Sequence, residues 1–78
     1  MEKFEISVSK GRQHHHFEVL DYMHHDGEQC KYEVYKHDLF VGSFEPDGFL
    51  GLRICKDPHV IHEDILHLIA HQLESYNL

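Results

Sequence analysis

The spacing of the apolar residues changes once along the chain, and this change constrains the fold more than any other feature. From Lys3 to Ser9, apolar and polar residues alternate strictly, which is typical of a half-buried strand. From about Ile61 to Tyr76, the apolar residues instead recur with a period of about 3.6, which indicates an amphipathic helix. The pattern therefore predicts strands followed by one C-terminal helix.

A two-residue turn at Gly11-Arg12 joins the first strand to a second strand, which runs from Gln13 to about His24. This turn fixes which residues lie opposite one another. The expected pairs are Phe4 with Val19, Ile6 with Phe17, and Val8 with His15. Because the apolar faces of the two strands then coincide, we expect this register to be the native one.

Asp26-Gly27 is the strongest hairpin signal in the chain, and it leads into a third strand from Gln29 to about His37. The expected pairs are Val19 with Val34, Met23 with Cys30, Glu18 with Tyr35, and His16 with His37. The same register places the charged Asp21 on the apolar face beside Tyr32, and the sequence gives no reason for this position.

The fourth strand, Leu39 to Glu45, has no clear inner face, because Leu39 and Val41 compete with Phe40 and Phe44 for it. Glu45-Pro46-Asp47-Gly48 fits a type I turn. A fifth strand from Phe49 to Lys56 would then bury Leu50, Leu52 and Ile54. The expected fold is α+β: an antiparallel β-meander of four to five strands with the helix packed on one face, in the order βββββα.

The 78 residues suffice for a single domain spanning 1–78. With 14 acidic residues against seven Lys and Arg, the net charge of −7 disfavours nucleic-acid binding. No apolar run could span a membrane, and the first residues do not look like a signal peptide, so we expect a cytoplasmic protein. In that compartment Cys30 and Cys55 should be free thiols.

His14 and His16 are the first candidate metal ligands, because residues two apart on a strand share a face. Glu18 lies on the same face, and His37 lies across from His16 in the expected register. Two or three imidazoles with a carboxylate would suit zinc, nickel or copper. The alternative is a solvated strand face. His15 should instead lie on the inner face, partly buried and hydrogen-bonded.

His67 and His71 form a second candidate pair, because residues four apart lie on one helical face. The neighbouring motif from His62 to His67 is one residue longer than the H-E-x-x-H of zinc peptidases, so its two histidines do not share a face. The peptidase interpretation therefore fails, and a solvated helix surface is the alternative for His67 and His71. His24 and His25 are interpreted as polar residues that flank a turn.

No other catalytic pattern is present in the sequence, so we expect a protein that is not an enzyme. Aromatic and apolar residues are predicted on the outer sheet face: Tyr35, Phe40 or Phe44, and Leu20 with Tyr22. Such a patch is typical of a partner surface or a homodimer contact. The leading hypothesis is a protein-interaction module, and the alternatives are a transition-metal-binding protein and an acidic inhibitor that mimics nucleic acid.

The hairpins and the terminal helix resemble small bacterial proteins in a general way, which implies no function. Five strands with a terminal helix are also similar to small barrel-like nucleic-acid binders. Those proteins are basic whereas this chain is acidic, so the similarity concerns the fold alone.

Overall fold

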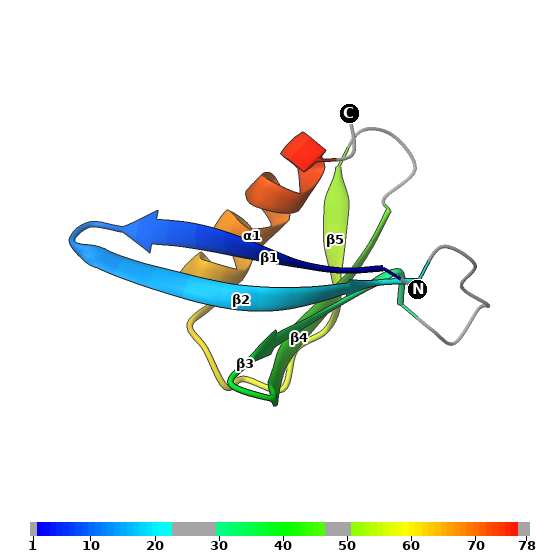
Figure 1. The fold of residues 1–78 in the computed structure, drawn as a ribbon, viewed down its shortest axis with the longest axis horizontal. Helices are drawn as coiled ribbons and strands as arrows, with labels where there is room; N and C mark the ends of the chain where they lie inside the picture. The colour runs from blue at the N-terminus through cyan, green and yellow to red at the C-terminus, as the bar shows by residue number, and fades with distance from the viewer. Residues whose placement is uncertain (1, 23–29, 47–50, 77–78) are drawn as a thin grey trace.

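The computed structural model describes residues 2–22, 30–46 and 51–76, and it has the predicted order βββββα. The strands are β1 (Glu2–Lys10), β2 (Gln13–Asp21), β3 (Tyr32–Lys36), β4 (Leu39–Pro46) and β5 (Leu52–Lys56), and the helix is α1 (Glu63–Tyr76). The strands form one antiparallel sheet in sequence order, with α1 beside it (Figure 1). This arrangement confirms the predicted α+β meander.

The register of the first three strands is as predicted for the residues that pair. The expected pair of His16 with His37 is not part of the ladder, because β3 ends at Lys36. Ile6 opposes Phe17, and Val8 opposes His15. Val19 opposes Val34 across the next ladder, and Glu18 opposes Tyr35. The expected pairing of Met23 with Cys30, the Asp26-Gly27 turn and the pair His24-His25 all involve positions outside the described residues.

The helix covers the sheet face that carries the alternating apolar residues. It contacts both β1 and β5, which are the two edges of the sheet, so the sheet curves around α1 (Figure 1). The buried core combines side chains of this inner face, Ile6, Val8, Phe17, Val19, Tyr32, Val34, Val41 and Phe44, with Ile65, Leu66, Ile69, Ala70 and Leu73 of the helix. The opposite face of the sheet is here called the outer face.

One register shift decides the orientation of β4, which the sequence left open. Gly42 opposes Val34 while Phe40 opposes Tyr35, so Val41 is the extra residue in a β-bulge. Val41 and Phe44 are consequently both fully buried, and Phe40 lies on the outer face beside Tyr35. Of the two alternatives for the outer face, Phe40 is therefore correct and Phe44 is not.

The fifth strand is shorter than expected: it begins at Leu52 rather than Phe49, and Leu50 lies outside the described residues. Leu52 and Ile54 pack against the core as predicted. The helix begins at Glu63 because His62 caps it. The amide of Asp64 donates to His62 Nδ1 at 3.3 Å, and the amide of Ile65 donates to the His62 carbonyl at 3.0 Å. In the described part of the chain, no helix has the length and apolar character to cross a membrane.

The prediction of free cysteines is wrong, because Cys30 and Cys55 form a disulfide with their Cα atoms 6.2 Å apart. The strand order explains why they meet. β4 lies between β3 and β5, and Phe44 opposes both Tyr32 and Ile54, so both cysteines lie near the same stretch of β4. The buried Ser43 hydroxyl donates to Cys30 Sγ at 3.3 Å. Sequence spacing alone does not reveal this proximity.

Candidate functional site

The outer face of the central strands carries a patch of half-buried apolar side chains. This aromatic patch consists of Leu20, Tyr22, Tyr35 and Phe40. The rings of Tyr35 and Phe40 meet edge to face, with centroids 5.6 Å apart at an interplanar angle of 63°. The structure thus places on one surface the residues that the sequence pattern predicted there.

Glu33 holds two rings of the aromatic patch in place. The hydroxyl of Tyr22 donates to Glu33 Oε1 at 2.8 Å, and the hydroxyl of Tyr35 donates to the same oxygen at 3.3 Å. The hydrogen bond to Glu33, together with partial burial, raises the pKa of Tyr22 to about 12. Partial burial and the Glu33 carboxylate also raise the pKa of Tyr35. Both phenols therefore stay neutral at physiological pH, and their orientation is fixed.

Two small hollows flank the Tyr35 ring, and both are lined by Tyr35 and Glu18. The first has a volume of about 190 Å³ and is also lined by Glu5, His16, Phe17 and His37. The second has a volume of about 200 Å³ and is also lined by Lys3, Leu20 and Asp38. Lys3 Nζ lies 3.0 Å from Glu18 Oε2, and this hydrogen bond raises the pKa of Lys3. Carboxylates around an aromatic ring suit a cationic group.

The candidate metal ligands on the strands are only partly brought together. His16, Glu18 and His37 line the first hollow, whereas His14 lies nearer the hairpin turn, 2.7 Å from Ser9 Oγ. Within the described ranges, no group of three or more His, Cys, Asp or Glu is arranged to hold a metal ion. Zinc binding by these residues stays a prediction that the geometry does not favour.

The candidate ligands on the helix lie apart from those on the strands. His67 and His71 are exposed, as predicted. His67 Nε2 lies 3.5 Å from Glu63 Oε1, and His71 Nδ1 lies 4.0 Å from Glu74 Oε2. Each imidazole therefore has a carboxylate neighbour on its own helix, an arrangement that a solvated helix surface also produces.

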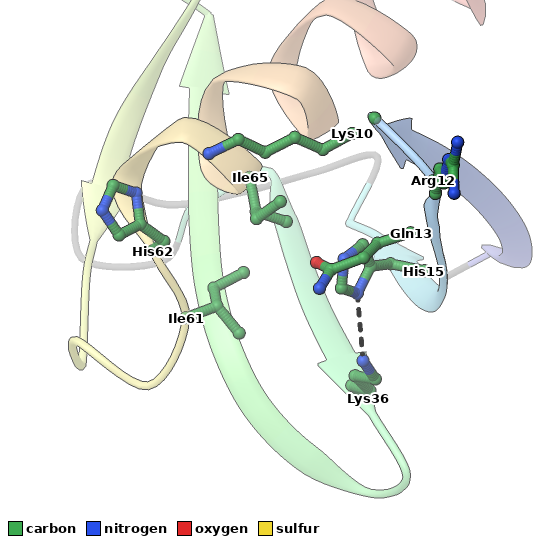
Figure 2. Close-up of a pocket in the computed structure, with 9 residues that line it drawn as sticks. Lys10, Arg12, Gln13, His15, Lys36, Ile61, His62 and Ile65 are labelled. Carbon is green, nitrogen blue, oxygen red and sulfur yellow. Dashed lines mark hydrogen bonds between the residues drawn. The ribbon is translucent and has the colours of Figure 1, made fainter.

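A larger hollow, which the sequence did not predict, lies between the β1–β2 turn and the start of α1 (Figure 2). It has a volume of about 840 Å³, and we call it the basic hollow. Its lining includes Lys10, Arg12, Lys36, His62, Ile61 and Ile65. The sequence signal was the pair of cations beside Gly11, but only the fold brings Lys36 and the helix start to the same place.

His15 connects the basic hollow to the core. Its ring stacks on Phe17 with centroids 6.2 Å apart, and its Nδ1 lies 3.2 Å from Lys36 Nζ. Because an ammonium group can only donate, Nδ1 is the acceptor of this bond. This position confirms that His15 is a partly buried, hydrogen-bonded residue of the inner face.

Comparisons with known proteins yield no relative: no protein-family model matches the chain, and the searches of curated proteins and of solved structures return no match.

Proposed function

We propose that the protein is a non-enzymatic interaction module whose outer sheet face binds a cationic segment of a partner protein. One observation carries this proposal: two hollows share Tyr35 and Glu18, and their linings contain three carboxylates against one lysine. A Lys or Arg side chain that enters either hollow would meet an aromatic ring and a carboxylate together. The aromatic patch beside the hollows supplies apolar contact area.

The charge of the chain favours a cationic partner over a second copy. Two copies that met through this face would bring Glu18 and Glu33 of each chain close to those of the other, and like charges at an interface are repulsive. A basic segment would instead be attracted by a molecule with a net charge of −7. Homodimerisation through the outer face is therefore the less favoured form of the interaction hypothesis.

The other two hypotheses receive less support. The carboxylates of a nucleic-acid mimic must be aligned on one face, but Glu18 and Glu33 lie on the sheet whereas Glu63 and Asp64 lie on the helix. Metal binding through His14 and His16 has no third ligand in a fitting position within the described part of the chain. Both stay predictions.

A peptide titration tests the proposal. The probe is a fluorescently labelled peptide of alternating Arg and Leu, and its counterpart has Glu in place of Arg. We expect saturable binding of the Arg peptide alone, with affinity that falls as salt is added. Absence of binding, or equal binding of the Glu peptide, would overturn the proposal. Sedimentation velocity of the free protein provides the second readout. A stable dimer would favour a second copy of the chain, instead of a cationic partner, as the occupant of the outer face.

A cytoplasmic location stays a prediction, and the Cys30–Cys55 bond weighs against it, because disulfides persist mainly in oxidising compartments. A thiol assay on protein extracted under alkylating conditions distinguishes free thiols from the disulfide. Alkylation of both cysteines would support a cytoplasmic location. Alkylation of neither cysteine would contradict a cytoplasmic location.

A further inference from the structure

The basic hollow gathers cations in a chain that is otherwise acidic. Three of the seven Lys and Arg residues, Lys10, Arg12 and Lys36, line it. None of its lining residues in the described part of the chain is acidic, although the sequence has 14 Asp and Glu. Because charges of one sign around a concave wall focus the electrostatic field, this hollow is locally attractive to anions.

Two of the three cations lie on opposite sides of the hollow, with apolar side chains between them. In Figure 2 the Lys10 side chain runs along the upper side of the hollow and Lys36 lies at its lower side, with Ile61 and Ile65 between them. Arg12 stands apart, at the hairpin turn. The site therefore rests on Lys10 and Lys36, with Arg12 as a more distant charge.

Lys36 is held in position by its neighbours. Its Nζ donates to His15 Nδ1 at 3.2 Å and lies 5.7 Å from the centroid of the Phe17 ring. The His15 bond uses one of the three N–H donors of the ammonium group, and the other two have no hydrogen-bond partner among the described residues. An anion in the hollow could accept hydrogen bonds from these two N–H donors without displacing His15.

We propose that the basic hollow binds a small organic anion, with its phosphate or carboxylate group between Lys10 and Lys36 and its apolar body against Ile61 and Ile65. The volume of about 840 Å³ falls within the range of about 300–1,000 Å³ that is usual for small-molecule sites. The hollow lies between the sheet and the helix start, whereas the proposed partner surface is the outer face. The two proposals can therefore fail independently.

Asp64 is the internal competitor of such an anion. Its Oδ2 accepts from Lys10 Nζ at 2.8 Å, and this bond lowers the pKa of Asp64. A ligand must share Lys10 with this carboxylate or displace it. Removal of the Asp64 charge should therefore tighten anion binding, whereas removal of a lysine charge should weaken it.

The test is an amide NMR titration of the full chain with phenyl phosphate, benzoate and phenol. We expect saturable shifts of the Gly11, Gln13 and Lys36 amides with one or both anions, and none with uncharged phenol. The two anions distinguish a phosphate ligand from a carboxylate ligand. If neither anion produces a saturable shift, or if phenol binds equally well, the proposal is wrong.

Three variants locate the site. Lys36→Met should weaken anion binding by about fivefold, because it removes one charge at short range in a solvated site. Asp64→Asn should tighten anion binding. Lys3→Met makes the same charge change on the outer face and should leave the affinity within about twofold. Equal losses for Lys3→Met and Lys36→Met would overturn the site. If Lys36→Met fails to fold, Lys10→Met replaces it, because the Lys10 side chain is about half exposed.

Discussion

Gly42 of β4 faces Leu66 of α1 so closely that a Cβ atom at position 42 would lie 2.8 Å from Leu66 Cδ2. Leu66 is fully buried, so its side chain has no free space into which to move. The missing side chain at position 42 therefore lets the helix approach the sheet. The closeness of this contact determines how tightly α1 packs on the inner face.

Gly42→Ala should lower the free energy of unfolding by about 1–3 kcal/mol, because the new methyl group overpacks the core against Leu66. Gly51→Ala is the matched control. Its Cβ would make an ordinary contact, 3.7 Å from Glu74 Oε1, and should change stability by less than about 0.5 kcal/mol. Chemical denaturation of both variants gives the comparison. Equal stabilities would show that the helix does not lie this close to β4.

Reduction of the Cys30–Cys55 bond should lower the free energy of unfolding by about 2–4 kcal/mol, because the bond closes a loop between residues 25 apart in sequence. Denaturant titrations with and without a reductant measure the difference. Cys55→Ser should lose the same stabilisation and should no longer respond to the reductant. A wild-type protein that is insensitive to the reductant would contradict the bond.

The ion pair between Lys31 and Asp21 should contribute more to the stability of the fold than the ion pair between Lys3 and Glu18. The first pair is 22% and 14% exposed, and the second is 63% and 35% exposed. Burial by itself would lower the pKa of Lys31, but its hydrogen bond to Asp21 contributes to a net increase.

Lys31→Met should therefore lower the free energy of unfolding by about 1–3 kcal/mol, because it leaves the largely buried Asp21 carboxylate without its partner. Lys3→Met should lower stability less, because solvent screens this largely exposed pair. Thermal or chemical unfolding of the two variants checks this order. The reverse order would mean that Asp21 finds another partner or is better hydrated than the structure indicates.

Tyr22 should titrate near pH 12 in the folded protein, because its phenol donates to the Glu33 carboxylate. An unfolded tyrosine titrates at about 10. The folded state therefore binds the phenolic proton more tightly, and the resulting stability is complete below about pH 10 and is lost as the pH rises to about 12.

The ring Cζ resonance of Tyr22, assigned with Tyr22→Phe, follows this titration by NMR. Glu33→Gln should lower the pKa of Tyr22, because the acceptor loses its charge. If Tyr22 already titrates near 10 in the wild type, the bond to Glu33 is absent in solution.

Local patterns sufficed for most of the fold. The alternation around Ile6 and the Gly11-Arg12 turn predict the first ladder, and they place His15 and Phe17 on the correct face. They could not predict the bulge at Val41, because the additional residue is accommodated by packing of β4 against the helix and not by a turn signal.

The sites were harder to predict than the fold. The aromatic patch follows from strand periodicity, so Tyr35 and Leu20 were placed correctly on the outer face. The position of Asp21 on the inner face is explained by its ion pair with Lys31, a partner that the strand pattern did not indicate. The disulfide and the basic hollow each join segments that are distant in sequence, so no local pattern indicates them.

The effect of Glu18→Gln on binding of the Arg–Leu peptide tests the central claim most directly, because Glu18 lines both hollows beside Tyr35. Glu63→Gln is the matched control: it makes the same change of charge on the exposed surface of α1. We predict that Glu18→Gln weakens the affinity by about fivefold while Glu63→Gln changes it by less than twofold. Equal effects of the two substitutions would contradict the assignment of the partner surface to the outer face.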